Sequence, residues 1–98
     1  MEQEAPVIYL ETKTEFSSTN NTYAIKGFLT DDNEVKHFSI FVGDDKVYYT
    51  APSAEENLKK VSFDTKIPLK KGINFITLSA QDNRDLISKR QWVVWRAQ

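Results

Sequence analysis

The chain has 98 residues, of which 40% are hydrophobic and 28% are charged, and it contains no cysteine. This length fits one domain with its own core, and the absence of thiols excludes disulfides and thiolate metal sites. The 13 basic and 14 acidic residues nearly balance, which disfavours a nucleic-acid partner. No run approaches the roughly 20 apolar residues of a membrane span, so membrane insertion is not expected. The acidic start Met1-Glu-Gln-Glu is unlike a secretory signal. We expect a single domain over residues 6–96, cut from a longer protein.

Short runs of alternating apolar and polar residues follow one another along the chain and predict β-strands. The turns between them carry Gly, Asn and Asp, which adopt tight turns at low cost. Gly27, inside one run, indicates a bulge or a close approach of another backbone. Ser53 with Glu56 could cap a short helical turn. In chain order, the predicted strands cover residues 6–12, 22–29, 35–42, 46–50, 58–69, 75–81 and 86–96, and residues 15–21 are expected to form a loop.

Strands about 8–12 residues apart, with turn signals between them, predict an all-β fold, an immunoglobulin-like antiparallel β-sandwich of about seven strands. The residues of each strand that share the apolar face should form the core. These are Ile25, Leu29, Phe38, Ile40, Val42, Phe63, Ile67, Ile76, Leu78 and one of Val93 or Val94.

The clearest hairpin signal is residues 67–82, where a glycine separates two apolar runs. We expect Gly72 to adopt a positive φ, since glycine has no Cβ to hinder it. Asn74 should bond neighbouring backbone, as short polar side chains do at strand starts. Both residues are therefore interpreted as holding the turn rather than a ligand.

The sequence offers little for catalysis. His37 is the only histidine, and no serine lies in a Gly-x-Ser-x-Gly or Ser-x-x-Lys pattern. Nucleophilic catalysis needs a nucleophile, a base and a group that orients the base. We therefore expect no enzymatic activity, no catalytic residues and no cofactor in this chain.

Four aspartates lie in two predicted turns: Asp31, Asp32, Asp82 and Asp85. In an immunoglobulin-like sandwich these two turns lie at the same end, so their carboxylates could converge. Calcium prefers oxygen ligands supplied in this way. Aspartate is also a common turn residue, and the turn role is the one that we favour. No metal is therefore expected, and calcium at these aspartates is the alternative.

Some aromatic residues fall outside the expected core, and Phe41, Tyr48 and Trp95 are the candidates for an interaction. An exposed aromatic can contact another protein or stack on a sugar ring. A sugar site needs polar groups converging beside an open ring face. A protein contact needs a broader apolar patch with a polar rim.

Several segments are distinctive, among them Gly27-Phe-Leu-Thr-Asp-Asp, Phe41-Val-Gly-Asp-Asp-Lys-Val-Tyr-Tyr and Val93-Val-Trp-Arg. Over about residues 6–96 they resemble the C-terminal β-domain that follows the PDZ and peptidase regions of bacterial carboxyl-terminal processing (tail-specific) peptidases. The segment that begins at Phe41 is the most specific to that group. The pattern Pro68-Leu-x-x-Gly-x-Asn74 is shared more widely by bacterial immunoglobulin-like modules, including those appended to polysaccharide-active enzymes. The chain departs from many of these relatives at Lys70, Lys71 and Trp95, where they carry more arginine.

This resemblance implies a non-catalytic accessory module of an envelope serine peptidase, which positions domains or partners. The family's catalytic Ser and Lys belong to the peptidase domain, which no segment here matches. The implied partners are other domains of the parent protein or an envelope protein, in the periplasm or cell envelope of a bacterium, and the isolated domain should be monomeric. The alternative is a carbohydrate-binding or spacer module of a secreted polysaccharide-active enzyme or surface protein.

Overall fold

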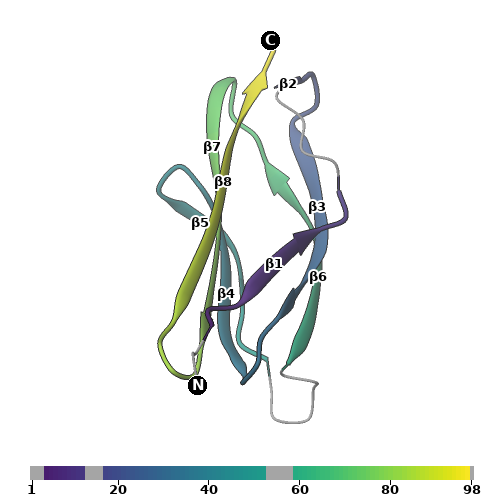
Figure 1. The fold of residues 1–98 in the computed structure, drawn as a ribbon. Coiled ribbons are helices and arrows are strands. Elements are labelled where there is room, and N and C mark those ends of the chain that lie inside the picture. Colours follow the sequence, from purple (N-terminus) through teal and green to yellow (C-terminus); the bar gives the residue numbers. More distant parts are fainter. Residues whose placement is uncertain (1–3, 13–16, 53–58, 98) are drawn as a thin grey trace.

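The computed structural model describes residues 4–12, 17–52 and 59–97, and these residues form strands and connecting turns without a helix (Figure 1). The all-β prediction is confirmed. The described part of the chain forms β1 (Val7–Leu10), β2 (Ser17–Ser18), β3 (Thr22–Thr30), β4 (Val35–Val42), β5 (Asp45–Thr50), β6 (Lys60–Pro68), β7 (Gly72–Asp82) and β8 (Ile87–Arg96). Within these ranges no helix is long and apolar enough to cross a membrane. The proposed cap of Ser53 and Glu56 lies outside the described residues.

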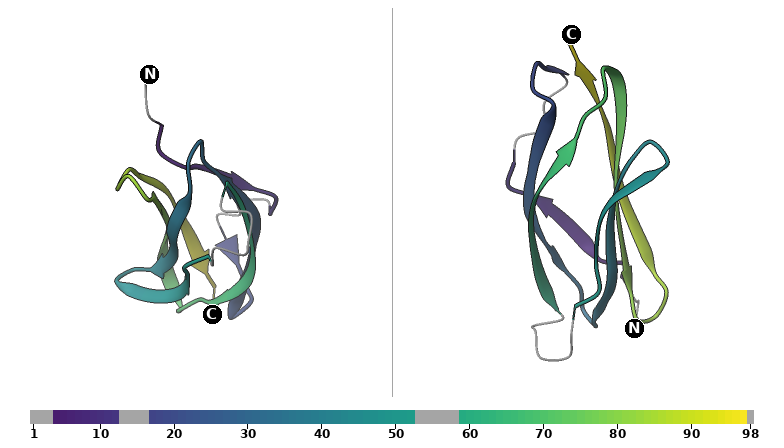
Figure 2. Two further views of the ribbon diagram at one scale, coloured as in Figure 1. Left: turned by 90° about the horizontal axis from the view of Figure 1, so that it is seen from below. Right: turned by 180° about the vertical axis from the view of Figure 1, so that it is seen from behind.

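The strands form two sheets that pack on opposite sides of one core (Figure 2). The three-stranded sheet has the order β1-β3-β6, and the five-stranded sheet has the order β2-β8-β7-β4-β5. The described strands pair antiparallel except β2, which runs parallel to β8 and pairs Ser17 with Trp95 and Ser18 with Arg96. This short strand lies in the segment predicted as a loop, so the described part of the chain has eight strands instead of about seven.

The core consists of the inward residues of both sheets, and every residue predicted for it is buried. Val94 is fully buried whereas Val93 is 38% exposed, which decides the choice between them. The rings of Phe38 and Phe63 stack across the two sheets with centroids 4.5 Å apart. The buried apolar residues are Tyr23, Ile25, Leu29, Val35, Phe38, Ile40, Val42, Val61, Phe63, Ile67, Leu69, Ile76, Leu78, Ala80 and Val94.

Gly27 allows the first strand to lie close against β3. Its backbone pairs with Leu10, and a Cβ atom at this position would overlap the backbone oxygen of Tyr9. The register of β3 runs through this position without a shift on either side. Of the two interpretations of Gly27, close backbone approach is therefore the one that holds.

The molecule is elongated, with extents of 49, 26 and 22 Å, and the two ends of the described chain lie at opposite ends of its long axis (Figure 1). At one end the β3–β4 and β7–β8 turns meet, where the N–H of Asn83 donates to the carbonyl of Glu34 at 3.0 Å. Toward the other end, Lys70 in the β6–β7 turn bonds Asp45 of β5 at 3.1 Å. The turn cluster predicted for Asp31 and Asp82 is thus at the end away from the β6–β7 turn.

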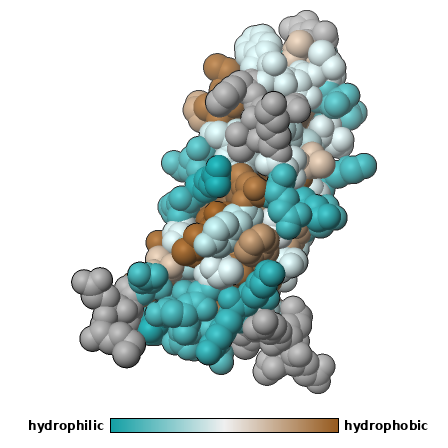
Figure 3. Space-filling model, turned by 45° about the vertical axis from the view of Figure 1, so that its right-hand side comes forward, coloured by the Kyte–Doolittle hydropathy of each residue, from teal (hydrophilic) through white to brown (hydrophobic). Residues whose placement is uncertain are grey.

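The outer face of the three-stranded sheet is largely polar. Seen with the β3 side forward, a narrow band of hydrophobic residues lies between hydrophilic ones (Figure 3). The exposed apolar residues of β1 are Val7 and Tyr9, and the ring of Tyr9 stacks on Phe28 with centroids 4.8 Å apart. The ammonium of Lys60 lies 4.7 Å from the centre of the Phe28 ring. The ring of Phe28 is therefore covered by its neighbours, whereas Tyr9 is 46% exposed.

Candidate functional site

The outer face of the five-stranded sheet carries the residues with the most potential for binding. Its central strand, β7, alternates as predicted, with Ile76, Leu78 and Ala80 buried and Phe75 exposed. The outward residues of β4, β7 and β8 lie in register across the sheet. Along this face, the outward side chains are apolar at one end of the strands and more polar in the middle.

At the apolar end, two pairs of exposed residues stand directly opposite each other. Ile73 pairs with Trp95, and Phe75 pairs with Val93. Their exposed fractions are 59% for Ile73, 50% for Trp95, 61% for Phe75 and 38% for Val93. Directly opposed residues on one face are close neighbours, so these side chains form a contiguous surface, called here the apolar patch. The next outward pair, Thr77 and Gln91, is polar and joined by a side-chain hydrogen bond of 3.3 Å.

The β6–β7 turn fixes the start of this surface. Gly72 has φ 90°, as expected, a conformation that a side chain would strain. Asn74 is 2% exposed, and its Oδ1 accepts the N–H of Lys70 at 2.8 Å. Its Nδ2 donates to the carbonyls of Lys70 at 2.8 Å and Val94 at 3.2 Å. The positive φ of Gly72 and the backbone hydrogen bonds of Asn74 are as predicted, and the turn precedes Ile73 directly.

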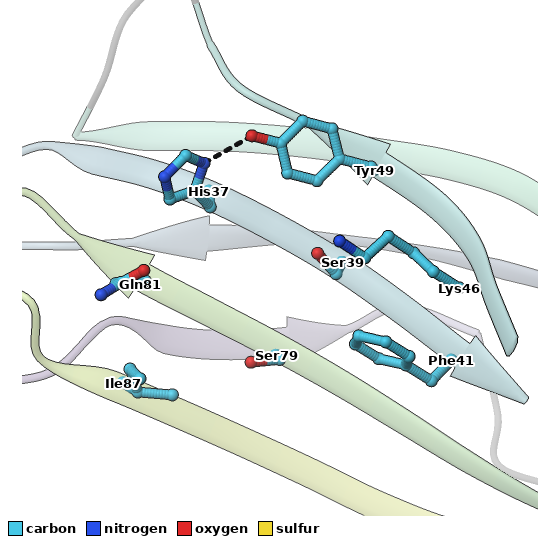
Figure 4. Close-up of a pocket in the computed structure, with 8 residues that line it drawn as sticks. All are labelled: His37, Ser39, Phe41, Lys46, Tyr49, Ser79, Gln81 and Ile87. Carbon is cyan, nitrogen blue, oxygen red and sulfur yellow. Dashed lines mark hydrogen bonds between the residues drawn. The ribbon is translucent and has the colours of Figure 1, made fainter. Parts of the chain in front are cut away.

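In the middle of the face, an open groove of about 540 Å³ lies between β4, β5, β7 and β8 (Figure 4). His37 Nδ1 lies 2.5 Å from the hydroxyl of Tyr49, a hydrogen bond that joins β4 to β5. The ammonium of Lys46 lies over two rings, 5.8 Å from the centre of Phe41 and 5.1 Å from that of Tyr49. This polar groove is lined by His37, Ser39, Phe41, Lys46, Tyr49, Ser79, Gln81 and Ile87.

The three aromatic candidates from the sequence fall in different places. Trp95 is exposed in the apolar patch, and Phe41 is half-buried in the wall of the polar groove. Tyr48 is half-buried, and its ring packs edge-on against Phe38 with centroids 6.1 Å apart. Tyr48 therefore lacks the exposure that an interaction candidate needs. The cause is a β-bulge, because Ile40 pairs with Tyr48 whereas the next residue, Phe41, pairs with Lys46.

Sequence reasoning missed Ile73, Val93 and Tyr49 as surface candidates. Tyr49 is 49% exposed and forms one side of the polar groove. The predicted strand of residues 75–81 left Ile73 outside it, and the choice between Val93 and Val94 for the core stayed open. What the sequence lacked was the register that sets Ile73 opposite Trp95.

The aspartates of the two turns come together in part. Asp31, Asp32 and Asp82 have carboxylate oxygens within 4.8 Å of one another. Asp85 does not join them, since it has φ 66° and its exposed carboxylate lies 3.9 Å from Lys36. The predicted set of four is therefore reduced to three, called here the aspartate cluster.

Charge in the aspartate cluster is only partly balanced. Arg84 hydrogen-bonds the carboxylate of Asp32, and its Nη2 lies 3.8 Å from Asp82 Oδ2. Burial raises the pKa of Asp31 above its ordinary value, and the carboxylates of Asp82 and Asp32 raise it further. The N–H of Asn33, which donates to Asp31, and the charge of Arg84 act in the opposite direction.

No family model matches this chain, and no curated protein matches it. Among solved structures, it is similar to the fibronectin(III)-like modules of Clostridium thermocellum CbhA, with a TM-score of 0.64 and 13% identity. The match covers 95% of this chain and 47% of the other, so the chain spans about half the length of that neighbour. At this identity the likeness establishes the architecture, an immunoglobulin-like sandwich of two sheets.

Proposed function

We propose that this domain is a non-catalytic accessory module that contacts another protein surface through the apolar patch. The observation that carries the proposal is the pair of opposed apolar couples, Ile73 with Trp95 and Phe75 with Val93, all exposed at one end of a sheet. Contiguous exposed apolar surface is typical of protein contacts. Aromatic residues such as Trp and Phe are enriched in the centres of interfaces. Because the patch lies on paired strands, little backbone freedom is lost on binding.

The competing function, carbohydrate binding, is less well supported by the same face. The polar groove has the required mixture of rings and polar groups, but the ammonium of Lys46 lies over both Phe41 and Tyr49. A sugar ring needs an open aromatic face on which to stack. Trp95 is open, but its neighbours on β7 and along β8, Ile73 and Val93, are apolar. Ser17 of β2, which pairs with Trp95 on its other side, is one polar group, where a sugar site needs several that converge beside the ring.

The setting that we propose is an envelope peptidase of the carboxyl-terminal processing type, with this domain appended to its PDZ and peptidase regions. The support is the sequence resemblance over residues 6–96, together with a fibronectin(III)-like fold that suits accessory and spacer roles. The elongated shape, 49 Å in its longest extent with the described ends at opposite poles, suits a spacer as well. In this setting the apolar patch holds the domain against its own protein or against an envelope partner.

Site-specific photo-cross-linking tests the contact. A benzoylphenylalanine replaces Phe75 in the complete protein in its own cells, and a matched control replaces Lys66, which is exposed on the outer face of the three-stranded sheet. We expect protein cross-links from Phe75 and few from Lys66. A cross-link into a peptidase or PDZ region supports the proposed setting. Equal cross-linking from both positions, or none from Phe75, would overturn the contact.

A glycan titration tests the competing function. Cell-wall glycans are added to the isolated domain while tryptophan fluorescence is followed, in the natural sequence and in Trp95→Ala. The half-buried Trp92 reports on folding in both proteins. We expect no saturable change. A saturable shift that is lost in Trp95→Ala would replace protein contact by carbohydrate binding.

A further inference from the structure

In two carboxylates of the aspartate cluster, one oxygen accepts backbone hydrogen bonds and the other has no hydrogen-bond partner among the described residues. Asp82 is fully buried, and its Oδ1 accepts the N–H groups of Arg84 at 2.9 Å and Leu86 at 3.0 Å. Its Oδ2 is buried and has no hydrogen-bond partner among the described residues. Asp31 repeats the arrangement: Oδ2 accepts the N–H of Asn33 at 3.1 Å, whereas buried Oδ1 finds no donor in the ranges that the structure describes.

The unpartnered oxygen of Asp82, Oδ2, is directed into the cluster. Nη2 of Arg84 hydrogen-bonds Asp32 Oδ1 and lies 3.8 Å from Asp82 Oδ2, so both oxygens face the same point. A separation of 3.8 Å is too long for a hydrogen bond, so the guanidinium satisfies Asp32 and leaves Asp82 unsatisfied. One guanidinium also cannot balance three carboxylates, and an uncompensated buried carboxylate is costly.

We propose that Asp31, Asp32 and Asp82 bind one calcium ion, and that Arg84 is the cation that lies in the site when calcium is absent. Calcium–oxygen distances are about 2.3–2.6 Å, so two oxygens on one ion can be separated by up to about 5.2 Å. The carboxylate oxygens of the cluster lie within 4.8 Å of one another and meet this limit.

Coordination chemistry favours calcium over magnesium at these carboxylates. Magnesium binds oxygen at about 2.0–2.1 Å, so its ligands would have to lie within about 4.2 Å. Magnesium also demands near-octahedral geometry, whereas calcium accepts irregular sets completed by water. The ligands of the cluster are exclusively oxygens, which excludes a preference for softer metals.

Calcium here would join the β3–β4 turn to the β7–β8 turn, at the end of the sandwich away from the β6–β7 turn. Asp31 and Asp32 belong to the first turn, and Asp82 ends β7. Arg84 is 25% exposed in its side chain, so its guanidinium can move into solvent as the ion enters. The site is distinct from the apolar patch and does not depend on the proposed function.

Thermal unfolding in chelator, in calcium chloride and in magnesium chloride tests the site. The variant Asp32→Asn removes a ligand at a half-exposed position, and the control Asp44→Asn neutralises an exposed aspartate in the distant β4–β5 turn. Asp82 is left unchanged because its Oδ1 caps the β7–β8 turn. At about 100-fold the dissociation constant, calcium should raise the Tm of the natural sequence by roughly 10 °C or more.

The rise should persist in Asp44→Asn and disappear in Asp32→Asn, which should remain folded in chelator. Calorimetric titration with calcium alone should give one site, and Arg84→Gln should bind calcium more tightly because the competing cation is gone. No calcium-dependent rise in the natural sequence, or an equal rise in Asp32→Asn, would overturn the site. An equal response to magnesium would overturn the assignment to calcium, and unchanged affinity in Arg84→Gln would overturn the role of Arg84.

Discussion

The two sheets use the same alternation on their inner faces and differ on their outer faces. The outward positions of β6 are polar or charged, among them Lys60, Ser62, Asp64 and Lys66. On the five-stranded sheet, by contrast, the outward positions at the start of β7 and the end of β8 form the apolar patch. Inward residues determine that the chain folds as a sandwich, and outward residues determine which face is available for a contact.

The aromatic residues on the two outer faces sharpen this comparison. Phe28 is stacked on Tyr9 and lies under the ammonium of Lys60. In the apolar patch, Phe75 and Trp95 are at least half exposed. On the three-stranded sheet Tyr9 itself is 46% exposed, so the two faces differ in the extent of their exposed apolar surface. Val7 and Tyr9 lie along one strand, whereas the apolar patch spans two paired strands.

The largest predicted effect is a loss of stability when a residue of the core that both sheets share is truncated. Leu78→Ala removes a fully buried side chain between the sheets and should lower the free energy of unfolding by about 2–5 kcal/mol, since a cavity remains. Ile40→Ala should behave alike. Urea unfolding measures the change, and Lys89→Ala on the exposed face of β8 is the control. A loss below about 1 kcal/mol would show that the two sheets do not share one core.

A smaller effect is predicted for the turn that precedes the apolar patch. Asn74→Ala leaves the N–H of Lys70 and the carbonyl of Val94 without their buried partner, which should cost about 1–3 kcal/mol. Chemical denaturation measures it, and Asn20→Ala at an exposed position is the control. Unchanged stability together with lost binding would instead make Asn74 a contact residue.

The apolar patch itself should matter for contact more than for folding. Trp95→Ser should change the free energy of unfolding by less than about 1 kcal/mol, because the side chain is 50% exposed. It should weaken the protein contact by about 1–2 kcal/mol, roughly a tenfold change in affinity. Ser62→Ala on the three-stranded sheet should change neither quantity. A large loss of stability in Trp95→Ser would mean that the patch belongs to the core.

The smallest effect concerns charge in the aspartate cluster. Burial raises the pKa of Asp31 above 3.8, so the folded chain binds that proton more tightly than the unfolded chain. The resulting penalty is present at neutral pH and disappears as the pH falls below about 3.8. Asp31→Asn should therefore raise the Tm slightly at pH 7 in chelator, and the gain should vanish at low pH. If Asp31→Asn had a lower Tm than the natural sequence at pH 7, the predicted penalty from the charged carboxylate would be contradicted.

Alternation predicted most of the fold because it depends only on neighbours in the chain. It placed Leu78 in the core and narrowed another core position to Val93 or Val94, of which Val94 is the buried one. Turn chemistry identified Gly72 and Asn74 as residues of the β6–β7 turn. Alternation could not predict β2, because two serines carry no hydrophobic pattern. Alternation and turn chemistry are local signals, whereas β2 is defined by its pairing with β8, which lies far along the chain.

The candidate site was harder to predict because it depends on register between strands. The bulge in the β4–β5 pairing turns Tyr48 toward the core, and no residue pattern announces it. The opposition of Ile73 and Trp95 follows from pairing across a whole hairpin. Asp85 leaves the aspartate cluster through its positive φ, a conformation uncommon for residues other than glycine.

The most direct test of the contact face is the accessibility of Trp95 to a fluorescence quencher. The variant Trp92→Phe leaves Trp95 as the reporter in this domain. Iodide quenching is compared between the isolated domain and the protein as the cell makes it, purified without dissociating its partners. We predict strong quenching in the isolated domain, because Trp95 is 50% exposed, and clear protection in the native assembly. Equal quenching in both would contradict the central claim that the apolar patch is a protein contact surface.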